Sequence, residues 1–186
     1  MTLDPLRRLS RRALPVLRFE DQKIPLVVTT TDLQAGVPAY WHSTGDLLDP
    51  VIASMSLPGV FPPVVIGGRQ HVDGGVSNNV PFAPALERGA QKMLLILCTC
   101  CPAPRNALRS PLAVLLRSFQ ISLETKYSCD LHQQRRQGVA MLKVEPQLDR
   151  DVGPLDFRHA DALIRATYEQ TVAALARPDV VARAAA

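Results

Sequence analysis

Residues 71–81, His-Val-Asp-Gly-Gly-Val-Ser-Asn-Asn-Val-Pro, are the stretch that decides the fold of this 186-residue chain. Residues 70–73 predict a short strand, so the carboxylate of Asp73 comes where that strand ends. Gly74 and Gly75 then permit a positive φ and a close approach of the backbone. Asp-Gly-Gly is also a common turn sequence. A carboxylate placed in this way indicates the edge of a sheet, where α/β proteins bind ligands.

Strands alternate with helices on both sides of this stretch, which predicts an α/β layered fold. Residues 58–63 (PGVFPP) and the proline-rich residues 101–111 predict loops. Strands are predicted at residues 24–31, 39–41, 70–73, 92–98 and 139–145, with the first two paired across a turn at Gly36 and with 92–98 as a central strand covered on both faces. Helices are predicted at residues 4–17, with Asp4 as N-cap and Pro15 as a break or kink, and at 50–55, 81–88, 112–137 and from Asp156 onward.

The length suits a single domain over residues 1–186. Its expected parts are a basic lead-in at 1–23, a core with the Asp motif at 24–100, the loop at 101–111, and helices with one strand at 112–180. The sequence contains no uninterrupted run of about 18 apolar residues, which is the length that would predict a transmembrane helix. The first residues have no apolar core typical of a secretory signal, so we expect a cytoplasmic protein, with a peripheral membrane position as the alternative.

The net charge of +4 is concentrated near the start of the chain, at Arg7, Arg8, Arg11, Arg12 and Arg18. One interpretation is a basic amphipathic surface that meets anionic lipid headgroups. The other is the solvated face of a single helix. Nucleic acid is disfavoured as a partner, because only 5% of the residues are aromatic and they form no stacking stripe.

The cysteines and histidines indicate no metal site. Cys98, Cys100, Cys101 and the pair Cys129 and His132 are metal-capable types, but their spacing matches no zinc pattern. We expect free thiols, with Cys98 as a small core residue at a strand end, and neither metal nor cofactor. Two further residues lie near the motif: His71 is expected at the surface, and Asp32 is expected to cap a turn.

Several motifs occur in one order along the chain and together resemble the patatin-like phospholipase family. They are Thr31-Asp32-Leu33 with Gly36, residues 53–63 (ASMSLPGVFPP), Val72-Asp73-Gly74-Gly75 with Asn78, Asn79 and Pro81, and Gly89-Ala90. The resemblance extends from about residue 26 to residue 98 and more weakly to the end. It implies a three-layer α/β/α sandwich and hydrolysis of acyl esters in lipids by a Ser–Asp dyad without a cofactor.

On this resemblance, Asp73 is the base of the dyad, and Asn78 and Asn79 shape the turn behind it. The family's nucleophile lies in a G-x-S-x-G elbow, which needs two small residues beside the serine. No serine of this chain has both: Trp41 replaces the first glycine for Ser43, and Asn79 replaces the second for Ser77. The glycine-rich oxyanion loop is likewise not found before Leu26.

The sequence is therefore expected to begin after the elbow, with the domain truncated at its N-terminal side. Two functions remain open. The chain is either part of a patatin-like hydrolase that supplies only Asp73, or a catalytically inactive domain that binds lipid or a partner protein. A sheet without its first strands would expose an edge, which makes self-association an expectation.

Overall fold

The computed structural model describes residues 2–97, 107–136, 139–144 and 157–176. Its contacts group the chain into two compact units, Met1–Arg88 with Leu115–Asp130, and Gly89–Val114 with Leu131–Ala186. The clustered cysteines at 98–101, most of the loop predicted at 101–111, and the predicted helix cap at Asp156 lie outside the described residues. The division of the chain into a single domain with four parts stays a prediction.

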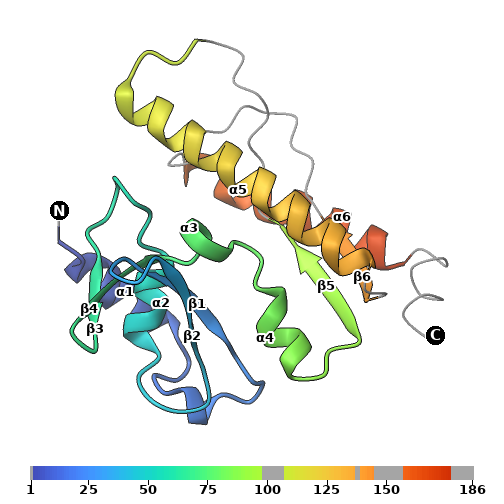
Figure 1. Ribbon diagram of the computed structural model, residues 1–186, viewed down its shortest axis with the longest axis horizontal. Coiled ribbons are helices and arrows are strands. Elements are labelled where there is room, and N and C mark those ends of the chain that lie inside the picture. Colours follow the sequence, from blue (N-terminus) through green and yellow to red (C-terminus); the bar gives the residue numbers. More distant parts are fainter. Residues whose placement is uncertain (1, 98–106, 137–138, 145–156, 177–186) are drawn as a thin grey trace. The chain divides into compact units, whose positions relative to one another are not determined.

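Helices and strands alternate along the chain, so the protein is a mixed α/β protein (Figure 1). The strands are β1 (Val28–Asp32), β2 (Val37–Trp41), β3 (Val64–Ile66), β4 (Arg69–Asp73), β5 (Lys92–Ile96) and β6 (Ala140–Val144). The helices are α1 (Asp4–Ala13), α2 (Leu48–Ser54), α3 (Gly75–Asn78), α4 (Phe82–Glu87), α5 (Pro111–Arg136) and α6 (Ala160–Leu175), with short 3-10 helices at Phe19–Asp21 and Phe157–His159.

The first unit is built on a four-stranded antiparallel sheet in the order β2-β1-β4-β3. β1 and β2 form the predicted hairpin, and Gly36 adopts a φ of 69° in its turn, a conformation that glycine adopts without steric cost. β4 pairs with β1 so that Asp73 lies opposite Thr30. Sequence reasoning missed β3, because three apolar residues before a Gly-Gly turn are too short to show strand periodicity.

Two apolar clusters attach α1 and α2 to this sheet. Leu48, Ile52 and Ala53 of α2 pack with Val64, and residues of α1 lie against the same cluster. A second cluster joins Phe19, Val28 and Leu47. α1 ends before Pro15, as expected, because a residue that precedes proline favours the extended conformation that Leu14 adopts (φ −75°, ψ 127°). The N-cap is Leu3 rather than Asp4, which lies inside the first turn.

In the second unit, β5 pairs with β6 in a parallel register. The prediction of a central strand covered on both faces was wrong for the described residues. Met93 is partly buried and Leu95 is buried, whereas Leu94 and Ile96 are about half exposed. An all-apolar strand usually indicates burial on both sides, but here the residues that the structure describes cover only one.

Candidate active site

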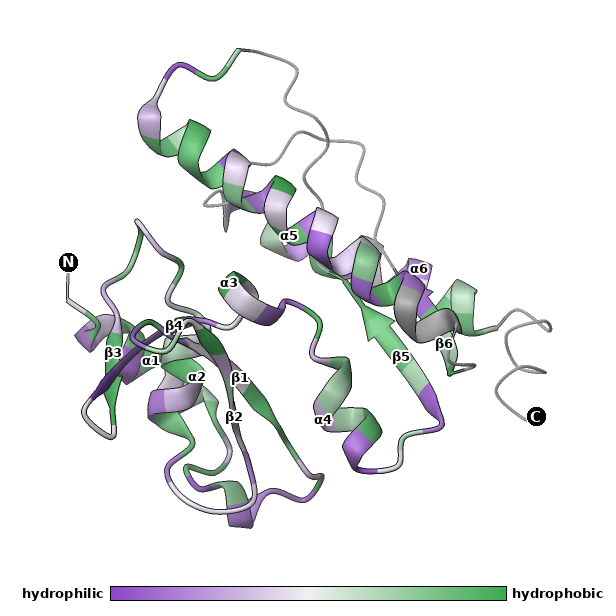
Figure 2. Ribbon diagram, in the orientation of Figure 1, coloured by the Kyte–Doolittle hydropathy of each residue, from purple (hydrophilic) through white to green (hydrophobic). Residues whose placement is uncertain are grey.

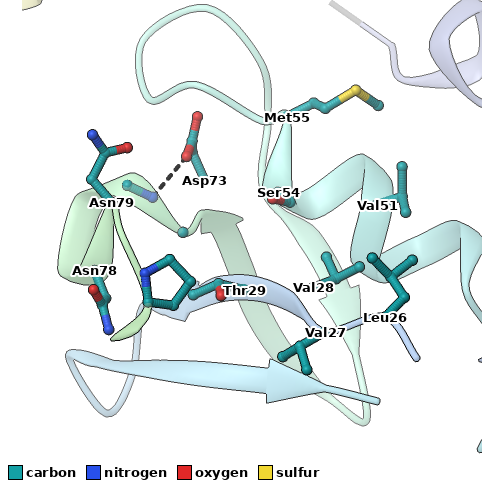
Figure 3. Close-up of a pocket in the computed structure, with 13 residues that line it drawn as sticks. Leu26, Val27, Val28, Thr29, Val51, Ser54, Met55, Asp73, Asn78 and Asn79 are labelled. Atoms are coloured by element: carbon teal, nitrogen blue, oxygen red, sulfur yellow. Dashed lines mark hydrogen bonds between the residues drawn. The ribbon is translucent and has the colours of Figure 1, made fainter. Parts of the chain in front are cut away.

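Asp73 is the last residue of β4, and α3 begins two residues later, so the carboxylate stands at the predicted strand end. Its Oδ1 accepts a hydrogen bond from the backbone N–H of Gly75 at 2.8 Å (Figure 3). Its own N–H donates to the carbonyl of the buried residue Ser56 at 3.1 Å. Burial raises the pKa of Asp73 above its ordinary value, and the Gly75 hydrogen bond opposes that shift only in part.

Thr31 fixes the backbone on which Asp73 sits. The buried Thr31 hydroxyl donates to the Asp73 carbonyl at 2.9 Å and lies 2.8 Å from Oγ of Ser77 on α3. One side chain of β1 therefore joins the end of β4 to the following helix. The role of Thr31 was not predicted, although the sequence contains an indication of it: in a strand, a run of three threonines places alternate hydroxyls on opposite faces.

The two glycines after Asp73 allow close packing around the turn and do not adopt an unusual backbone conformation. A Cβ added to Gly74 would lie 2.4 Å from the carbonyl oxygen of Thr29, so only glycine allows this approach. Gly74 has a φ of −61°, and Gly75 is not among the glycines with positive φ. The expected close approach is confirmed at Gly74, and the expectation of a positive φ was wrong because the chain turns directly into α3.

A pocket of about 410 Å³ opens beside Asp73 (Figure 3). Its wall is largely apolar, and the side chain of Asp73 is its one ionisable group. The lining residues are Leu26, Val27, Val28, Thr29, Val51, Ser54, Met55, Asp73, Gly74, Gly75, Asn78, Asn79 and Pro81. Leu26 precedes β1, whereas Val51 and Met55 lie one turn apart at the end of α2, so the sequence alone did not indicate that they share a pocket.

Asn78 and Asn79 line the same pocket. The Asn78 side-chain amide donates to Oη of Tyr40 at 2.7 Å, which connects α3 to β2. Oδ1 of Asn79 lies where a Cβ on Gly75 would meet it, at 3.1 Å. Both asparagines therefore stand directly behind the Asp-Gly-Gly turn, while their part in catalysis stays a prediction.

His71 lies inside the protein, so its expected surface position was wrong. Its side chain is 3% exposed, with Nδ1 3.1 Å from the hydroxyl of Thr30, which also accepts the Trp41 indole N–H at 2.7 Å. The Trp41 ring meets His71 edge to face. The local sequence does not indicate this burial, which arises because α2 packs on the side of the sheet where His71 lies, with Val64 of β3 paired beside it. Burial lowers the pKa of His71.

Asp32 accepts the backbone N–H groups of Gln34 and Ala35, which confirms its expected position as a turn cap. It also forms an ion pair with Arg69 of β4. The hydrogen bond from Arg69 holds the pKa of Asp32 well below its usual range. This carboxylate is therefore occupied in holding β1 to β4 and is not available as a base.

We predict that His71 makes the stability of the chain depend on pH. Because the folded state lowers the pKa of His71, the unfolded state binds the proton more readily, and the free energy of unfolding should fall as the pH drops below about 6.5. One such proton contributes a slope of at most about 1.4 kcal/mol per pH unit. Urea unfolding of the wild type and of His71→Gln between about pH 7.5 and 5 measures the difference. Identical slopes would contradict the prediction.

The family of the N-terminal part of the chain follows from its sequence similarity. Residues 1–86 match the model of the patatin-like phospholipases. This segment of the chain belongs to the patatin-like phospholipase family. The match includes β1, α2 and the Asp-Gly-Gly motif of β4, on which the resemblance in the sequence was based.

Curated patatin-like relatives extend this result. An uncharacterised NTE family protein of Mycobacterium tuberculosis is 30% identical over a stretch that covers 75% of this chain and 27% of the relative. The lysophospholipase NTE1 of Kluyveromyces lactis is 35% identical over 74 residues, and the patatin-like phospholipase domain-containing protein 7 of Mus musculus is 37% identical over 81 residues. These stretches cover 40% and 42% of this chain but only 5% and 6% of the two relatives. The chain thus spans about a quarter or less of the length of these relatives.

Other kinds of site would need clustered metal ligands, reactive thiols or long apolar helices among the described residues. No group of three or more His, Cys, Asp or Glu side chains in these residues is placed to hold a metal ion. Cys129 is a free thiol at the surface. Among the described helices, none combines the length and the apolar character needed to cross a bilayer.

Proposed function

We propose that this chain is the part of a patatin-like acyl-ester hydrolase that carries the catalytic base, Asp73. One observation carries the proposal: a half-buried carboxylate, with no ion pair among the described residues, stands on the wall of an apolar pocket. A base needs a pKa nearer to the working pH than that of an ordinary carboxylate, and burial moves Asp73 in that direction. Asp32, the other acid on this sheet, is tied to Arg69 and shifted the opposite way.

The proposed chemistry uses a serine as nucleophile and Asp73 as its base. Asp73 accepts the serine proton while the serine oxygen attacks the ester carbonyl, and it then passes that proton to the alcohol as the alcohol leaves. Asp73 then draws a proton from water, which cleaves the acyl-enzyme and returns the serine. Since no G-x-S-x-G occurs in the 186 residues, the proposal assigns the serine and the oxyanion donors to a segment outside them, within a complete three-layer sandwich.

The pocket fits the acyl half of such a substrate. Leu26, Val27, Val51 and Met55 offer an apolar wall to a hydrocarbon chain, and the carboxylate of Asp73 lies on the same wall. Gly74 and Gly75 keep the turn compact, and Asn78 and Asn79 support it from α3. A lipid or another acyl ester is therefore the proposed substrate class, and the chemistry needs no cofactor.

A fluorophosphonate probe, which reacts only with an activated serine, tests this function. The 186-residue chain should remain unlabelled and should hydrolyse a fluorogenic acyl ester no faster than buffer. A longer polypeptide, extended through the upstream coding sequence to an in-frame G-x-S-x-G, should be labelled and should turn over the ester. If no such motif is encoded and the chain binds lipid without hydrolysis, the inactive-domain alternative is correct instead.

A further inference from the structure

We propose that the outer face of α1 docks the protein on an anionic lipid surface. The proposal deepens the proposed function, because the substrate of a lipid hydrolase lies in such a surface. Its test needs no catalysis, so its failure is distinguishable from a failure of the hydrolase assignment. The docking face is defined here as Arg8, Leu9, Arg11 and Arg12.

The structure divides the arginines near the start of the chain into two groups. Arg7 forms an ion pair with Asp49, and Arg18 forms one with Glu20. Arg8, Arg11 and Arg12 are exposed, and within the described residues they form no ion pair. The two paired arginines serve the fold, whereas the other three present their charge to solvent.

The three unpaired arginines lie together on one side of α1. Arg8 is three residues before Arg11 and four before Arg12, and these spacings make helix neighbours. Like charges at these spacings destabilise a helix by a few tenths of a kcal/mol per pair. The last-turn positions of Arg11 and Arg12 offset part of that cost through the helix dipole. An anionic partner would attract all three arginines and so outweigh the remaining repulsion between them.

Leu9 distinguishes this face from an ordinary solvated one. It is 64% exposed and is one helix turn from Arg12, so an apolar side chain lies at the edge of the cationic group. Basic residues around an exposed leucine fit a bilayer interface, where phosphates meet the guanidinium groups and the leucine enters the acyl boundary. The visible turns of α1 are coloured mainly as hydrophilic in Figure 2.

The inner side of α1 holds this face in place. Leu3 and Leu6 pack against the cluster that includes Ile52 and Val64, and Ser10 is buried. The Arg7–Asp49 ion pair adds a polar link between α1 and α2. The helix is therefore anchored to the unit that contains Asp73, and lipid can bind its outer face without unfolding it.

Co-sedimentation of the 186-residue chain with vesicles tests the proposal. The chain should bind vesicles of phosphatidylcholine with one-third phosphatidylglycerol and should bind pure phosphatidylcholine far more weakly. Each arginine near such a surface contributes about a fivefold factor in partitioning. The variant Arg8→Gln/Arg11→Gln/Arg12→Gln should therefore bind about 100-fold more weakly, and raising the salt should release the wild type. Leu9→Ser should lose several-fold at constant charge.

A matched variant removes the same charge elsewhere, from three exposed side chains that form no ion pair among the described residues: Lys23→Gln, Arg109→Gln and Arg165→Gln. It should bind as the wild type does. Equal losses in both triple variants, or equal binding to both vesicle types, would overturn the proposal, as would tighter binding to duplex DNA than to anionic vesicles. If the α1 variant does not fold, vesicle protection of the wild type from trypsin at Arg8, Arg11 and Arg12 decides, and unprotected cleavage overturns it.

Discussion

Asp73→Asn should lower ester hydrolysis on the order of 10⁴-fold in the polypeptide that carries the nucleophilic serine. The amide keeps the shape of the carboxyl group and can still accept the Gly75 N–H, so the turn is preserved. It cannot accept the serine proton, which removes both half-reactions. The rate with a soluble acyl ester at saturating concentration measures the loss, and a fall in kcat with little change in KM is expected.

The same substitution should make the 186-residue chain more stable at neutral pH. Burial raises the pKa of Asp73, so the folded state prefers the protonated form. The stability that this group contributes is present below its ordinary pKa of about 4 and is lost as the pH rises through the folded-state pKa. Asn removes the buried charge, so its advantage in the free energy of unfolding should be clear at pH 7 and vanish near pH 4.

An exposed carboxyl group provides the control. Asp21→Asn removes the same charge from a surface position of the same unit and should leave both activity and the pH dependence of unfolding close to those of the wild type. An Asp73→Asn enzyme with full activity would show that Asp73 is not the base. A variant that is less stable than the wild type at pH 7 would show that the carboxylate, and not merely its shape, holds the turn.

The sequence predicted those parts of the site that local chemistry dictates. A short strand that ends in an acid before two glycines was predicted, and β4 with Asp73 as its last residue confirms it, whereas the helix α3 that follows was not predicted. The β1–β2 hairpin was predicted for a similar reason, since Gly36 separates two runs rich in strand-forming residues. Asp32 was predicted as a cap from the family resemblance of its motif, and its carboxylate accepts the backbone N–H groups of Gln34 and Ala35.

What the sequence did not predict depends on contacts between distant segments. His71 looks like a surface residue until α2 packs on its side of the sheet and Val64 of β3 pairs beside it. The hydroxyl of Thr31 reaches Asp73 and Ser77, which are 42 and 46 residues away along the chain. The pocket likewise joins Leu26, which precedes β1, to Val51 and Met55 at the end of α2, and no periodicity within one segment indicates that these two segments meet.

Gly74→Ala should be the most damaging single methyl addition in this region. The new Cβ would lie 2.4 Å from the carbonyl oxygen and 2.7 Å from the carbonyl carbon of Thr29, both of them backbone atoms of β1. Backbone cannot rotate away as a side chain can, so β1 and the turn before α3 must separate. Overpacking of this kind costs about 3 kcal/mol or more in the free energy of unfolding. Urea unfolding measures the cost.

Substitutions at two other glycines distinguish steric overlap from backbone strain as the cause of the lost stability. Gly75→Ala would bring its Cβ within 3.1 Å of only the side-chain oxygens of Asp73 and Asn79, which can shift, so it should cost less than Gly74→Ala. Gly36→Ala meets no atom within 4 Å but keeps a φ of 69°, and should cost about 1 kcal/mol through backbone strain alone. If Gly74→Ala proved no worse than Gly36→Ala, the close approach of β1 would not be what requires glycine after Asp73. If Gly74→Ala is instead the most destabilising of the three substitutions, the missing side chain at Gly74 is what allows the turn after Asp73 to lie closely against β1.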